Sequence, residues 1–134
     1  MSETSLCDKE NKAVDMAIFV KTSSPGMLVD SIREKIKSQT IKTWTVDEDG
    51  DMTHAAEQWK YNAWIRTKIE PGLSRVVFYI ICRNDRNLSV SDYAIYHGRF
   101  VEMLLTHFDK DCQSIEVTAL ASKYDSVVAF KKNG

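Results

Sequence analysis

The chain has 134 residues, 43% of them apolar, so it is long enough to bury one hydrophobic core without disulfides or metals to reinforce it. Its 18 basic and 19 acidic side chains leave a net charge of −1, which excludes the strong overall positive field that holds nucleic acids or anionic membranes. The composition predicts a single globular domain over residues 1–134, with flexible ends at 1–12 and 131–134.

The N-terminal region and the cysteines indicate a cytoplasmic protein. The apolar run Met16–Val20 is too short for the core of a signal peptide, and no membrane contact is expected. Cys7, Cys82 and Cys112 are an odd number without the spacing of a metal or redox motif. We therefore expect no disulfide framework, and Cys82 is interpreted as a buried strand residue.

The first expected elements are a strand and an amphipathic helix. Residues 13–21 contain five apolar residues in a row, which favours a strand over a short helix. Ser24 is a good N-cap and Pro25 suits the first helical position, so a helix is expected from there to about Gln39. Its apolar face consists of Leu28, Val29, Ile32 and Ile36.

A β-hairpin is expected after this helix. From Ile41 the pattern has a period of two, with Trp44 and Val46 on one side and threonines on the other. Asp49-Gly50 is a strong turn signal, because glycine tolerates the positive φ of a tight hairpin turn. The return strand is predicted at 52–60.

A second pair of strands follows. Ala63, Ile65, Thr67 and Ile69 alternate with Trp64, Arg66 and Lys68, which predicts a strand with two different faces. Pro71-Gly72 turns the chain. The segment 76–82 is apolar at every position except Tyr79, as expected of a central strand that is covered on both faces.

The last large element is a second helix from Ser89 to about Phe108, with Ser89 and Asp92 at the spacing of a capping box. Its apolar residues span about half of the helix circumference. Strands are expected at 114–121 and 127–130. The order α-β-β-β-β-α-β predicts an α+β fold, in which two helices pack on one face of an antiparallel sheet of about five strands.

Motifs for metal binding and catalysis are missing from the sequence. With Gly50 at the obligatory glycine of a calcium loop, Thr45 and Ala56 would stand where carboxylates are required. There is no G-x-S-x-G elbow and no glycine-rich phosphate loop, so no metal and no cofactor are expected. A Cys–His pair formed in space, Cys82 with His97 or Cys112 with His107, stays open.

Aromatic and cationic residues on the expected sheet suggest a partner-binding face. Such residues can hold an extended peptide or stack on bases, although a solvated sheet face has the same composition. Nucleic acid is the less favoured partner because of the net charge. The candidate partner-binding residues are Trp44, Trp64, Arg66, Lys68 and Tyr79, with Trp59 as a neighbour.

An alternative site is a pocket on the second helix, lined by Tyr93, Tyr96, His97 and Phe100. It would make the protein a small enzyme or ligand-binding protein. His97 and His107 both lie within the apolar arc, but ten helical residues separate them by about 15 Å, so they cannot share an ion. The other interpretation of His97 is a buried histidine bonded to backbone or to a tyrosine.

The order of elements and the Asp-rich hairpin resemble the α+β fold of type III secretion chaperones and their non-secretory relatives, over residues 25–120. This resemblance implies a homodimer that binds a segment of a partner protein. Independently, the wide apolar arc of the second helix and the two apolar faces of 76–82 predict more apolar surface than one chain covers. We therefore expect a non-enzymatic, chaperone-like interaction module, most simply a homodimer.

Overall fold

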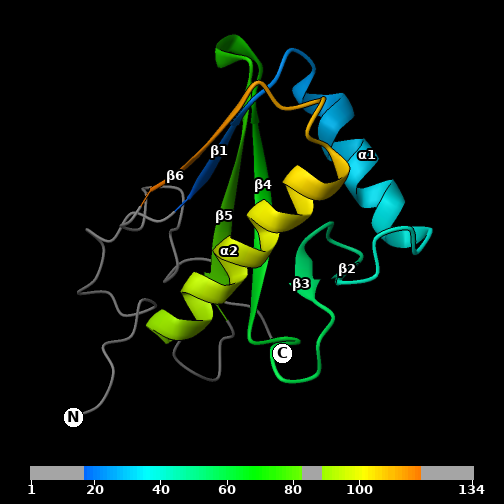
Figure 1. Ribbon diagram of the computed structural model, residues 1–134, viewed down its shortest axis with the longest axis vertical. Helices are drawn as coiled ribbons and strands as arrows, with labels where there is room; N and C mark the ends of the chain where they lie inside the picture. The colour runs from blue at the N-terminus through cyan, green and yellow to red at the C-terminus, as the bar shows by residue number, and fades with distance from the viewer. Residues whose placement is uncertain (1–16, 83–88, 119–134) are drawn as a thin grey trace.

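The computed structural model describes residues 17–82 and 89–118 and has the expected α+β architecture, with one antiparallel sheet and two helices (Figure 1). The sheet has six strands where about five were expected. In chain order the elements are β1 (Ile18–Lys21), α1 (Pro25–Lys37), β2 (Trp44–Val46), β3 (Met52–His54), β4 (Ala63–Glu70), the short 3-10 helix η2 (Pro71–Leu73), β5 (Arg75–Cys82), α2 (Val90–His107) and β6 (Ser114–Val117).

The strands lie in the order β2-β3-β4-β5-β1-β6, so β2 and β6 are the two ends of the described sheet. The N-terminal strand predicted within 13–21 is confirmed: β1 pairs with β5 on one side and with β6 on the other. The long β4–β5 hairpin is in register from Ala63 opposite Cys82 to Glu70 opposite Arg75. Two predictions for the chain ends, the flexible segments 1–12 and 131–134 and the strand at 127–130, lie outside the described residues.

Both helices pack on the same face of the sheet, where α2 crosses the long strands and α1 lies beside β2 (Figure 1). The core between them is continuous, because residues of α1, α2 and one face of the strands belong to a single buried cluster. Helix α1 contributes the four apolar residues that the sequence pattern assigns to its inner face, namely Leu28, Val29, Ile32 and Ile36.

Helix α2 begins as predicted, since the Oγ atom of Ser89 accepts a hydrogen bond from the backbone N–H of Asp92 at 3.0 Å. Its buried stripe is narrower than the apolar arc that the sequence indicates. Ala94 is exposed and Leu105 is 55% exposed, because both lie at the margins of the stripe. Helix α2 therefore carries less surplus apolar surface than expected.

Strand β5 is the central strand that the sequence predicts, and a single copy of the chain already covers it. Val76 and Phe78 face the helices, while Val77 and Ile81 face the other way, and all four have no exposed surface. The apolar run at 76–82 therefore gives no reason for a second copy. The fold therefore does not support the expectation that a dimer is needed to cover apolar surface.

Two further expectations are wrong in detail. The return strand ends at His54 rather than near residue 60, because the N–H of Ala56 bonds to Nδ1 of His54 and the N–H of Tyr61 bonds to Oγ1 of Thr53, which turns the chain. Cys82 is buried as expected, but it is disulfide-bonded rather than a thiol.

Within the described residues, neither helix is long and apolar enough to cross a membrane.

Candidate functional site

The residues of the predicted α2 pocket lie in the core. Tyr93, Tyr96 and Phe100 have no exposed surface and His97 is 3% exposed. His97 donates from Nδ1 to the carbonyl oxygen of Tyr93 at 2.9 Å and stacks on the Tyr93 ring. None of these four residues lines the four cavities identified among residues 17–82 and 89–118. The group therefore acts as packing in the described part of the chain.

Tyr96 also ties α2 to the turn after β3. Its hydroxyl donates to the carbonyl oxygen of Trp59 and lies 3.0 Å from Oγ1 of Thr53. Burial raises the pKa of Tyr96 above its usual value, so the phenol stays protonated. A buried hydroxyl that is held in this way stabilises the fold and is a poor proton acceptor at neutral pH.

The five residues of the predicted partner-binding face do not lie together. Val46 is opposite Met52, and Met52 is opposite Ile65, so β2 side chains at even positions share the helix-covered face with Ile65. Trp44 is therefore in the core, 2% exposed, whereas Trp64 points to the opposite face. Placing Trp44 on the same surface as Trp64 was wrong, because sequence alternation alone does not relate the faces of two different strands.

Arg66, Lys68 and Tyr79 do share the sheet face opposite the helices, together with Trp64. Arg66 forms a bidentate ion pair with Asp51, with distances of 2.9 and 2.7 Å. These hydrogen bonds raise the pKa of Arg66. Lys68 is exposed, but Trp64 is only 3% exposed. This face thus offers a partner less aromatic surface than the sequence suggests.

The acidic turn between β2 and β3 has a structural explanation. Carboxylate oxygens of Asp47, Asp49 and Asp51 lie within 4.8 Å of one another. Oδ1 of Asp47 accepts hydrogen bonds from the N–H groups of Asp49 and Asp51 at 2.9 and 3.0 Å, and Asp51 pairs with Arg66. The carboxylates therefore hold the hairpin turn, as the turn chemistry predicts.

His54 and Cys112 are the other candidate reactive groups. His54 lies edge-on to the rings of Trp44 and Trp59, and burial lowers its pKa, which the positive charge of Arg99 lowers further. Burial raises the pKa of the Cys112 thiol, which disfavours the thiolate that nucleophilic catalysis requires. His54 is therefore a weaker base than a free imidazole, and the Cys112 thiol ionises less readily than a free one.

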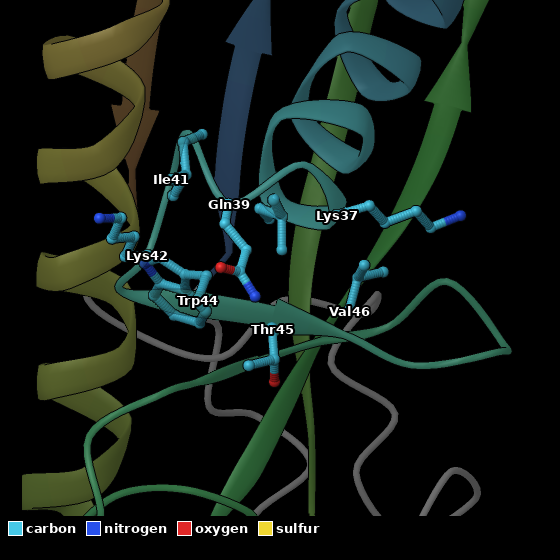
Figure 2. Close-up of a pocket in the computed structure, with 8 residues that line it drawn as sticks. Lys37, Gln39, Ile41, Lys42, Trp44, Thr45 and Val46 are labelled. Atoms are coloured by element: carbon cyan, nitrogen blue, oxygen red, sulfur yellow. The ribbon is translucent and has the colours of Figure 1, made fainter.

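A groove lies between the end of α1, the connection that follows it, and β2 (Figure 2). Its volume is about 380 Å³, and Lys37 and Lys42 lie at opposite ends of it. Between the two lysines its lining is mostly apolar. The remaining residues of this β2 groove are Ile36, Gln39, Ile41, Trp44, Thr45 and Val46.

The outer edge of β2 borders this groove and is not paired with another of the described strands. The N–H of Ala55 bonds to the carbonyl of Thr43, and the N–H of Asp47 bonds to the carbonyl of Asp51, so odd-numbered residues of the strand bond toward β3. In an antiparallel ladder the alternate residues then point their peptide groups outward. Trp44 and Val46 thus direct their N–H and C=O groups away from β3, on a side that has no neighbouring strand among the described residues; Val46 is half-buried there and Trp44 is 2% exposed.

This β2 edge and its groove were not predicted from the sequence. The signal that was present is a strand of three residues with charges on both flanks, which is typical of strands at the edge of a sheet. Comparison of the chain with protein-family models, curated proteins and solved structures gave no match. The resemblance to type III secretion chaperones therefore stays a prediction.

Proposed function

We propose that this protein is a non-enzymatic interaction module that binds an extended polypeptide segment along the β2 edge. The observation that carries this proposal is the outward alternation of the peptide groups of Trp44 and Val46 next to the β2 groove. Addition of a strand to an open sheet edge is a general mode of peptide recognition. The homodimer that the sequence favours is one assembly in which this edge is occupied.

The energetics of such binding follow from the edge. Each main-chain hydrogen bond to an added strand contributes about 0.5–1.5 kcal/mol, and two residues offer up to four such groups. The mostly apolar floor of the groove receives alternate side chains of the segment, which adds burial and selectivity. Lys37 and Lys42 favour acceptor or acidic groups at the ends of the groove.

The reactive groups support binding over catalysis as the proposed activity. His54 accepts a hydrogen bond from the N–H of Ala56, and His97 donates one to the carbonyl of Tyr93. Both rings are packed against aromatic neighbours. Neither histidine lines the β2 groove.

Site-specific photo-crosslinking tests the proposed function. A photoreactive benzoylphenylalanine at Lys37, which is exposed and lines the groove, is expected to form covalent adducts with a polypeptide in cells that produce the protein. The additional change Val46→Pro removes one outward N–H without removing a bond to β3 and is expected to reduce these adducts.

The matched control carries the same photoreactive residue at Ser91, an exposed position in the first turn of α2. If both positions give the same adducts, or if Val46→Pro leaves the Lys37 adducts unchanged, the β2 edge is not the binding surface.

A further inference from the structure

The β2 edge carries opposite charges at its two ends. Lys42 precedes the strand, whereas Asp47 and Glu48 follow it in the hairpin turn. The side chains of Lys42 and Glu48 are both exposed. Within the described part of one copy, neither forms an ion pair. When two such edges run antiparallel, the positive end of each one therefore faces the negative end of the other.

Antiparallel pairing of two such edges satisfies their backbone geometry. A two-fold axis at Thr45 places Trp44 of one copy opposite Val46 of the other, and both residues direct their peptide groups outward. Continued past β2, the same register brings Lys42 of each copy, which precedes the strand, close to Glu48 of the other, which lies in the hairpin turn. Opposite charges on facing antiparallel segments attract.

We propose that the occupant of the β2 edge is a second copy of this chain, paired antiparallel so that Thr45 faces Thr45, Trp44 faces Val46, and Lys42 faces Glu48. This inference rests on the proposed function, because it names the segment that the edge binds. The pairing extends the six-stranded sheet into a twelve-stranded one across a two-fold axis.

The charges favour a second copy over an acidic peptide. An acidic segment is attracted by Lys42 at one end of the edge, whereas at the other end the attraction of Lys37 is opposed by the repulsion of Asp47 and Glu48. A second copy meets an opposite charge at both ends, and the net charge of −1 gives little general repulsion between copies. The paired strand is only three residues long, so the dimer is expected to be weak and to depend on concentration.

Charge exchange between two variants tests this inference. In sedimentation equilibrium at low salt, the wild-type chain is expected to approach twice its monomer mass as its concentration rises. In a symmetric dimer, each of the variants Lys42→Glu and Glu48→Lys places two like charges opposite each other at both ends of the paired edge. Each variant alone is therefore expected to dimerise at least about tenfold more weakly than the wild type. An equimolar mixture of the two variants restores attraction at both ends and is expected to regain the mass of a dimer.

The control variant is Lys110→Glu, which changes the net charge by the same amount at an exposed position away from the β2 groove and is expected to dimerise like the wild type. A wild-type chain that stays monomeric at every concentration, or a mixture that associates no better than its components, overturns the inference. If the chain is monomeric but crosslinks from Lys37 to a different protein, the second-copy proposal fails while the proposed function stands. If the chain is monomeric and also gives no crosslinks from Lys37, the second-copy proposal and the proposed function both fail.

Discussion

Replacement of Phe100 by alanine is expected to lower the free energy of unfolding by about 3–5 kcal/mol, the usual cost of removing a large aromatic side chain from a packed core. Phe100 has no exposed surface. The centroid of its ring lies 4.7 Å from the ring centroid of Phe78 and 5.3 Å from that of Trp44. The cavity would open between α2 and the centre of the sheet. Urea unfolding followed by circular dichroism measures the change.

The control is Leu105→Ala on the same helix, where the side chain is 55% exposed and the expected change is within about 0.5 kcal/mol. The comparison also tests the alternative function. If Phe100→Ala costs less than about 1 kcal/mol, the site around Phe100 is not tightly packed, and a ligand pocket lined by Tyr93, Tyr96 and His97 has to be considered again.

Replacement of Gly50 by valine is expected to lower the free energy of unfolding by about 2–4 kcal/mol, from a backbone strain of about 1–2 kcal/mol and the loss of hydrogen bonds. Gly50 has a φ of +84°, which disfavours any side chain and a β-branched one most. A Cβ atom there would lie 3.0 Å from Cζ of Arg33. Arg33 joins α1 to the carbonyl of Gly50 and to Oγ1 of Thr67, and this contact fixes the hairpin that carries β2.

Gly98→Ala is the matched control, because Gly98 lies within α2 and a Cβ atom there meets nothing within 4 Å. This change is expected to raise the free energy of unfolding by about 0.5–1 kcal/mol, since alanine favours the helix. Thermal and urea unfolding of the two variants give the comparison. An equally small effect of both changes would mean that the turn does not need the positive φ and that Arg33 does not hold the hairpin in place.

Most of the fold follows from local signals in the sequence. The cap at Ser89, the proline at the start of α1, and the Asp49-Gly50 turn each have a short-range physical cause, and the structure has all three features. The alternation along β4 likewise separates Ala63 and Ile65 from Trp64. Such signals depend only on neighbouring residues, so they can be recognised without knowing the tertiary structure.

The site depends on relations between distant segments, which local patterns do not contain. Trp44 shares a face with Met52 and Ile65 only because of the cross-strand register, and this register moves it into the core. The alternation around Trp44 is the same whether β2 is a central or an edge strand. The groove beside it also needs the end of α1 to lie next to β2, which the periodicity of α1 does not predict.

Amide hydrogen exchange at β2 tests the pairing of two copies most directly. In concentrated samples the N–H groups of Trp44 and Val46 are expected to exchange at least about tenfold more slowly than in dilute samples, while the N–H of Thr45, which points toward β3, exchanges slowly in both. Exchange of Trp44 and Val46 that is equally fast at both concentrations would contradict the account.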